Sequence, residues 1–336
     1  MGGTVREILD DLSRWLAAGE SIALATVVQA EGSSPRPLGS RMAVTASGQM
    51  AGSVSGGCVE GDVFREAQAV LTDGGVRHLR YAGVGEEAWE VGLACGGTIG
   101  VFVEPLAEAH RLLVEALRRE EVVGFATHLD GAGHAIAWPD GRRHGDRSLA
   151  EELMPILEAE AFPSSQAVLG RHQGGDVFLE VFARPPTLTI VGAVHIAVPL
   201  VTMAQELGFH VRLVDARRAF ATQDRFPHVD ELVLAWPQEA LGRPTLRPRD
   251  AVVVLTHDPK FDVPALEVAL QSPVGYIGLL GSTTTQEKRR SALRERGFDA
   301  QALKRIHGPV GLELGGRRPS EIALAILAEI VAVQNE

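Results

Sequence analysis

Residues 188–197 read LTIVGAVHIA, a short apolar run rich in β-branched residues that reaches a glycine and continues into a second apolar segment. Similar runs follow, separated by helical patterns, at residues 210–215, 231–234, 251–255 and 274–279. Continuous apolar strands that alternate with helices are typical of a parallel sheet covered by helices on both faces. The sequence therefore predicts a C-terminal Rossmann-like parallel sheet domain, which we place at residues 187–336.

The turn after the first of these strands carries part of a dinucleotide-binding pattern. Gly192 supplies the first glycine, and Asp215 ends the next strand about 20 residues later, where such a site places its ribose-binding acid. Val194 occupies the position of the second glycine, where its side chain would meet the pyrophosphate. We predict a nucleotide-type site at Gly192, His195 and Asp215. Binding of NAD(P) is one interpretation, and a structural ion pair between Asp215 and a neighbouring arginine is the other.

Polar residues follow two further predicted strands, at residues 256–258 and 281–284. Ligands of open α/β sheets bind at this edge. His257 beside Asp258 is either an acid/base pair or a helix-capping turn. An amphipathic helix over residues 319–330 closes the predicted domain.

The N-terminal half places each of the two cysteines of the chain next to a glycine pair, as Gly56-Gly57-Cys58 and Cys95-Gly96-Gly97. Glycine pairs allow positive φ, so these thiols are expected on bare loops. The alternative is a small, buried side chain in a tight turn, since free cysteine is often buried. Two cysteines at this spacing fit neither a zinc knuckle, a redox pair nor a disulfide scaffold.

Cys58 is predicted to lie at the N-terminus of a helix that runs to about residue 71. The helix dipole there lowers the pKa of a thiol and favours the thiolate, which suits a soft metal ligand or a sulfur carrier. Cys58 is thus the predicted metal ligand. Glu60 and Asp62 fall in the first turn, where dipole-stabilised acids are the simpler interpretation than catalytic groups.

A loop rich in Gly, Ser and Pro spans residues 32–42 and carries Arg36 and Arg41. Its composition predicts irregular structure. Backbone N–H groups and guanidinium forks in such a loop can bind an anion. A solvated surface loop is the alternative.

Composition predicts two domains and excludes several functions. The 336 residues are 45% apolar and 22% charged, which is typical of a globular chain of about two domains. We expect a mixed α/β domain at residues 1–183, with residues 184–186 as the linker. A net charge of −11 without a basic stripe argues against nucleic acid. With neither a membrane span nor a secretory signal recognised, the expected location is the cytoplasm.

Several of these motifs together resemble the XdhC/CoxI family, accessory factors of xanthine dehydrogenase and related molybdenum hydroxylases. The segments that carry the resemblance are residues 32–37, 52–60, 92–97, 192–195, 215–217, 225–227, 276–282, 309–312 and 319–323. The chain departs from the family pattern at Val194, at Ala94 and at residues 283–285, and the first and third departures concern nucleotide or phosphate binding by the C-terminal domain.

The resemblance implies a molybdenum cofactor chaperone. Such a protein binds the pterin-dithiolene cofactor as cargo, protects it while a cysteine desulfurase supplies the sulfido ligand, and passes it to an apo xanthine dehydrogenase-type hydroxylase. The residues expected to hold the cargo are Arg36, Arg41, Ser55, Gly56, Gly57, Cys58, Glu60, Cys95, Gly96 and Gly97.

Two other functions stay open at this point. One is an NAD(P)-dependent oxidoreductase in which Cys58 or His257 acts on a small substrate. The other is a sulfurtransferase that carries a persulfide on Cys58. For the quaternary structure we expect a homodimer, formed through the terminal helix or through the N-terminal sheet.

Overall fold

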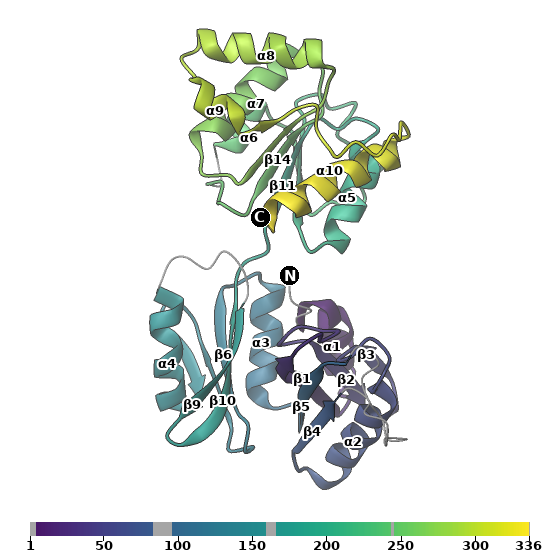
Figure 1. Ribbon diagram of the computed structural model, residues 1–336, viewed down its shortest axis with the longest axis vertical. Helices are drawn as coiled ribbons and strands as arrows, with labels where there is room; N and C mark the ends of the chain where they lie inside the picture. The colour runs from purple at the N-terminus through teal and green to yellow at the C-terminus, as the bar shows by residue number, and fades with distance from the viewer. Residues whose placement is uncertain (1–4, 83–95, 159–165, 243–244, 336) are drawn as a thin grey trace. The chain divides into compact units, whose positions relative to one another are not determined.

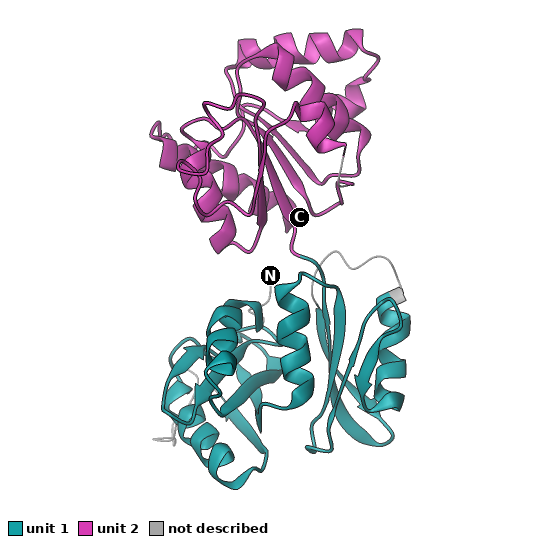
Figure 2. Cartoon of the chain, turned by 180° about the vertical axis from the view of Figure 1, so that it is seen from behind, with its two compact units in different colours: residues 1–184 teal, residues 185–336 magenta. Residues whose placement is uncertain are grey.

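The computed structural model describes residues 5–82, 96–158, 166–242 and 245–335. The chain divides into two compact units, unit 1 at residues 1–184 and unit 2 at residues 185–336 (Figure 2). Within the described residues, no helix is long and apolar enough to cross a membrane.

Unit 2 is built on a six-stranded, fully parallel sheet with the order β13-β12-β11-β14-β15-β16. Its strands are β11 (Thr187–Val191), β12 (His210–Val214), β13 (Glu231–Val233), β14 (Ala251–Val254), β15 (Tyr276–Leu279) and β16 (Ile306–His307). The predicted Rossmann-like parallel sheet is confirmed. The order reverses between β11 and β14, which is where ligands of such sheets bind.

Helices cover both faces of this sheet (Figure 1). One face carries α5 (Ala197–Glu206) and α10 (Pro319–Gln334), and the other carries α6 (Pro237–Leu241), α7 (Pro259–Gln271), α8 (Thr283–Glu295) and α9 (Ala300–Lys304). Successive strand residues point to opposite faces. Ile190 therefore packs with α5 and α10 while Val191 packs with α7, so both sides of each strand must be apolar.

Unit 1 contains two five-stranded antiparallel sheets. The first has the order β3-β2-β1-β5-β4, from β1 (Ile22–Glu31), β2 (Arg41–Thr45), β3 (Met50–Gly52), β4 (Arg77–Ala82) and β5 (Thr98–Pro105). The second has the order β8-β7-β6-β10-β9, from β6 (Val123–His128), β7 (His134–Ala137), β8 (Arg143–Gly145), β9 (Gln166–His172) and β10 (Gly175–Phe182). The predicted mixed α/β N-terminal half is confirmed.

Helices separate and cover these two sheets (Figure 1). The 3-10 helix η1 (Val5–Ile8), α1 (Leu9–Ala17) and α3 (Glu108–Arg118) pack between the sheets, α2 (Glu60–Asp73) covers the outer face of the first, and α4 (Arg147–Glu158) covers the outer face of the second. Val63, Ala67 and Val70 are spaced as one helix face and bury α2 on the first sheet. Each such buried valine contributes roughly 1.5–3 kcal/mol.

Two boundaries differ from the prediction, because α10 continues to Gln334 instead of ending at residue 330 and the loop before β2 is shorter than expected. The irregular loop was expected to reach residue 42, but β2 begins at Arg41, because residues 41–45 pair with β1 and are all buried.

Candidate functional site

The glycine-rich motifs of unit 1 meet at one edge of the first sheet, the edge formed by the ends of its strands. β1 ends at Glu31, which pairs with Thr98 at the start of β5. Met42 near the start of β2 pairs with Gly52 at the end of β3. The antiparallel register therefore brings three segments to this edge: residues 32–40, 53–59 and 96–97.

Gly97 is required by close packing at this edge. A Cβ there would lie 2.7 Å from the carbonyl oxygen of Ser33 and 2.9 Å from that of Glu31. The second glycine motif therefore packs closely against the 32–40 loop at Gly97. Gly96 is exposed with a φ of 76°. Cys95 lies outside the described residues.

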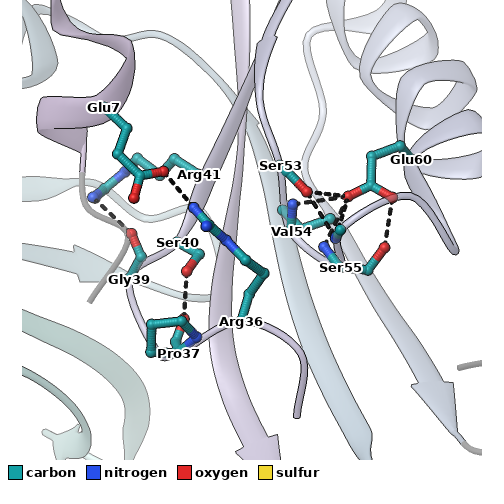
Figure 3. A network of polar contacts seen from close by, with 11 residues as sticks. Glu7, Arg36, Pro37, Gly39, Ser40, Arg41, Ser53, Val54, Ser55 and Glu60 are labelled. Atoms are coloured by element: carbon teal, nitrogen blue, oxygen red, sulfur yellow. Dashed lines mark hydrogen bonds and ion pairs between the residues drawn. The ribbon is translucent and has the colours of Figure 1, made fainter. Parts of the chain in front are cut away.

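Glu60 organises the segment that carries Cys58 (Figure 3). It is the first residue of α2, and its carboxylate accepts six hydrogen bonds from the preceding segment. The donors are Ser53 Oγ, Val54 N, Ser55 N, Ser55 Oγ, Gly56 N and Gly57 N, at 2.5–3.1 Å. The hydroxyl oxygen of Ser55 accepts from Cys58 N and Val59 N, both at 3.0 Å.

These hydrogen bonds keep Glu60 ionised. Burial alone would raise the pKa of Glu60, but hydrogen bonds from Ser53, Ser55 and the backbone lower it to about 2. Sequence reasoning treated Glu60 as a first-turn acid and missed its contacts. The signal was the pair of serines at positions 53 and 55, because hydroxyl donors just before a helix-starting glutamate allow it to turn back onto the loop.

Every amide from residue 54 to residue 59 therefore donates within the segment. These amides lie just before α2. They cannot hold an anionic group without displacing Glu60 or Ser55.

The outer face of the segment is bare backbone beside a thiol. Gly56 and Gly57 have φ values of 78° and 118°, and a Cβ on either would meet no described atom within 4 Å. Cys58 is exposed, so the alternative of a buried side chain is wrong for this cysteine. A flat ligand can lie against the glycine peptides while the sulfur, a soft donor, faces it.

The two arginines predicted to bind an anion both have carboxylate partners. Arg41 forms a two-pronged ion pair with Glu180 of β10, and the two side chains are only 2% and 3% exposed. This pair joins the first sheet to the second. Arg36 pairs with Glu7 of the 3-10 helix η1 and is partly exposed (Figure 3).

In unit 2, Asp215, which was predicted to bind a nucleotide, instead makes contacts within the unit itself. Asp215 is fully buried and accepts hydrogen bonds from Ala193 N at 2.9 Å and from the Arg217 guanidinium at 2.7 Å. Burial alone would raise the pKa of Asp215, but hydrogen bonds from the Arg217 side chain and from backbone amides hold it below its usual value. The structural ion pair, one of the two interpretations of Asp215, is therefore what the structure shows.

The rest of the predicted nucleotide-type site has structural roles as well. A Cβ on Gly192 would lie 2.7 Å from Thr256 Cγ2, so strand packing alone requires this glycine. Val194 packs against the core under α5 and α10, and His195 is exposed. Asp258 caps α7 by accepting from Lys260 N at 2.9 Å, which is the helix-capping interpretation of this loop. With Asp215 engaged, an NAD(P) ribose lacks its usual acceptor.

Sequence reasoning missed one buried polar cluster. Glu104 at the end of β5 accepts from His134 Nε2 at 2.7 Å and lies 3.5 Å from His110 Nε2, a grouping that could hold a metal ion. However, Ala107 N donates to His110 Nδ1 at 3.2 Å, so neutral His110 carries its proton on Nε2, the atom a metal would need. We interpret the cluster as a hydrogen-bonded network. No local sequence pattern predicts this cluster, because its three residues come from three separate elements, β5, α3 and β7.

Comparisons with known proteins agree with this architecture. Residues 15–82 match the XdhC and CoxI family, and residues 188–330 match the XdhC Rossmann domain. A probable subunit of xanthine dehydrogenase from Bacillus subtilis (strain 168) is 30% identical over 347 aligned positions, which cover 99% of this chain and 98% of that protein. The molybdenum cofactor insertion chaperone PaoD from Escherichia coli (strain K12) is 28% identical, covering 98% of this chain and 88% of that protein.

The fold also matches a solved structure. The crystal structure of a xanthine dehydrogenase from Bacillus halodurans aligns with a TM-score of 0.80 at 25% identity, covering 100% of this chain and 96% of that chain. The family matches fall in both units, and the similarity to the Bacillus subtilis protein spans nearly the full length of both chains. The chain therefore belongs to the XdhC and CoxI family, as the resemblance predicted.

Proposed function

We propose that this chain binds the molybdenum cofactor as cargo at the segment 53–60, holds it while its sulfido ligand is installed, and delivers it to a xanthine dehydrogenase-type hydroxylase. The observation that carries the proposal is an exposed thiol, Cys58, beside a glycine surface that Glu60 holds in place. The description of the Escherichia coli relative as a molybdenum cofactor insertion chaperone supports it.

The proposed roles follow from the local chemistry. The sulfur of Cys58 faces the molybdenum, for which a soft thiolate is a suitable ligand. The Gly56 and Gly57 peptides lie against the flat pterin, because no Cβ keeps it away. Glu60 does not touch the cargo; it fixes the shape of the segment.

Because the amides of residues 54–59 all have partners, the phosphate of the cargo must bind elsewhere. Arg36 and the exposed Gly96 lie on the other two segments of the same sheet edge. We propose that the phosphate binds at these two segments, where the partly exposed Arg36 would exchange its ion pair with Glu7 for the phosphate. Arg41 is left out of the proposed site because its guanidinium is buried against Glu180.

The first test is cargo content. The full chain is purified from a host that makes the cofactor, and molybdenum and pterin are measured by mass spectrometry and by fluorescence after oxidation. Wild-type protein should carry both. Cys58→Ser should carry at least about tenfold less of each, which corresponds to a loss of about 1.4 kcal/mol in the free energy of binding. The matched control is Ser47→Ala, in the exposed turn at the opposite edge of the same sheet. Full loading of the Cys58 variant would remove the thiol from the proposal.

The second test is delivery. Loaded protein is mixed with an apo-hydroxylase, with and without a cysteine desulfurase and cysteine, and the recovered hydroxylase activity is measured. We expect activity only when the desulfurase has acted before transfer. Equal activity from free cofactor would contradict a delivery role. The mass of the Cys58 peptide distinguishes the delivery function from the related sulfurtransferase function. A persulfide on Cys58 would place the sulfur on the chain rather than on the cargo.

A further inference from the structure

The backbone around Arg36 is stiff. Pro35 and Pro37 flank this residue, and each proline restricts the dihedral angles at its own position and at the residue before it. The hydroxyl group of Ser34 donates to the Arg36 carbonyl oxygen at 2.7 Å, and Leu38 packs against the buried core that α2 covers. The guanidinium group of Arg36 therefore projects from a backbone that stays in place when its partner changes.

The ion pair with Glu7 satisfies this guanidinium group only in part. Arg36 Nη2 donates to Glu7 Oε2 (Figure 3). Arg36 Nε is buried and, among the described residues, has no acceptor. A guanidinium group can donate from two N–H groups to one oxyanion, as Arg41 does to Glu180. Because a buried donor without an acceptor is unfavourable, Glu7 is a weak partner that a better acceptor can replace.

Glu7 can leave Arg36 without a change in the fold. Its side chain is 48% exposed, whereas that of Arg36 is 25% exposed. The 3-10 helix η1 is anchored by Val5 and Ile8, which are each 2% exposed and pack between the two sheets. Within the described residues, the Glu7 carboxylate has no other hydrogen bond. Rotation of this side chain into water therefore breaks one exposed ion pair, which costs little.

We propose that Glu7 is a built-in competitor for the cargo phosphate at Arg36. This inference rests on the proposed function and adds a mechanism of release to it. A phosphate monoester carries a charge of about −1.5 to −2 at pH 7 and three acceptor oxygens, so it replaces the single carboxylate contact. When the cargo is withdrawn, Glu7 returns to Arg36. The ion pair therefore lowers the affinity for the cargo and favours its release.

Such competition has a defined effect on affinity. Only the fraction of molecules in which Arg36 has separated from Glu7 can bind the phosphate, so the apparent dissociation constant rises by the inverse of that fraction. For a pair as exposed as this one, removal of Glu7 should tighten binding about twofold to sixfold. The gain requires Arg36, whereas a general effect of negative charge on an anionic ligand does not.

The first test is a double-mutant cycle on the full chain, with isolated molybdenum cofactor as the ligand and pterin fluorescence as the signal. Glu7→Gln should bind about twofold to sixfold more tightly than wild type, and Arg36→Gln should bind more weakly. Adding Glu7→Gln to Arg36→Gln should change nothing further. The matched control is Asp10→Asn, which removes the same charge from a nearby position that pairs with Arg118. It should bind as wild type does.

Two outcomes of the cycle would overturn the proposal. One is equal affinity of wild type and Glu7→Gln. The other is an equal gain from Glu7→Gln with and without Arg36, because the effect would then be one of general charge. In both cases the chain still binds the cofactor, so the proposed function survives.

The second test does not use the cofactor. Inorganic phosphate is titrated into the full chain, and the Nε–H resonance of Arg36 is followed by NMR. It should shift in wild type, and at about twofold to sixfold lower phosphate in Glu7→Gln. No shift in either protein, or shifts at equal phosphate, would overturn the proposal. A chain that binds no cofactor but shows this difference would contradict the proposed function and support competition at Arg36.

Discussion

Two of the glycine-bearing junctions between a strand and a helix, one in each unit, both use a carboxylate to accept backbone N–H groups, but they differ in what they leave exposed. Between β3 and α2, Glu60 accepts the backbone N–H groups of residues 54–57. Between β11 and α5, Asp215 accepts the N–H of Ala193. Glu60 lies behind its loop and leaves a thiol and two glycines facing outward, whereas Asp215 is fully buried and paired with Arg217.

The difference shows that a glycine at such a junction does not by itself indicate a ligand. At Gly192 the glycine is needed because Thr256 is too close for a Cβ. At Gly56 and Gly57 nothing described crowds the missing side chains, and their positive φ values are what favours glycine there. The exposed thiol of Cys58 distinguishes the first junction from the second, and we therefore propose binding at the first and a structural role for the second.

Asp215→Asn should have the largest effect on stability. The fully buried carboxylate accepts hydrogen bonds from Ala193 N and from the Arg217 guanidinium, and weakening these charge-assisted hydrogen bonds costs about 3 kcal/mol. We expect unit 2 to unfold at lower denaturant in equilibrium unfolding, while cofactor content stays at the wild-type level. Loss of cofactor without loss of stability would contradict the division of roles between the two junctions.

Glu60→Ala should cost about 2 kcal/mol, since it leaves several N–H groups without acceptors but the exposed ones recover water. Unlike Asp215→Asn, this change should also abolish cofactor retention, because the segment loses its shape. The control is Glu66→Ala, which removes the same charge from the same helix without touching residues 53–59. Normal cofactor content in Glu60→Ala would show that the segment does not need this carboxylate.

Lowering the pH should disrupt the hydrogen bonds of Glu60 at the junction between β3 and α2 over a defined pH range. The pKa of Glu60 is about 2 in the folded chain and 4.5 for an ordinary glutamate. A depressed pKa means that the contribution of Glu60 to stability is complete above about pH 4.5 and is lost as the pH falls toward 2. Amide resonances of Gly56 and Gly57 followed by NMR should shift in this range, and Glu60→Gln should remove the transition. A transition near neutral pH would contradict the hydrogen-bond network.

Gly56→Ala should have the smallest effect on stability, about 1 kcal/mol for a side chain at positive φ. Its methyl group points into the open face, so the free energy of cofactor binding should change by more than the free energy of unfolding. Gly48→Ala is the matched control, because Gly48 also has a positive φ and open space around it. Equal cofactor affinity in the two variants, measured by titration, would argue against a ligand on the glycine face.

Local sequence patterns predicted much of the fold and part of the site. The apolar runs such as residues 188–191 are a local signal and correctly indicated a parallel sheet. The role of Glu60 was not predicted, because a glutamate in a first helical turn has the same pattern whether it faces solvent or turns back to Ser53 and Ser55. The Arg41–Glu180 pair joins residues 139 apart, and no local pattern reports such a contact.

The central claim is that the cargo is held at Cys58 and not at the carboxyl edge of the parallel sheet. The most direct test is an anaerobic titration of the full chain with isolated molybdenum cofactor, followed by pterin fluorescence, for wild type, Cys58→Ser and Asp215→Asn. We predict at least about tenfold weaker binding for Cys58→Ser and wild-type binding for Asp215→Asn. Wild-type affinity in Cys58→Ser together with lost affinity in Asp215→Asn would contradict the account.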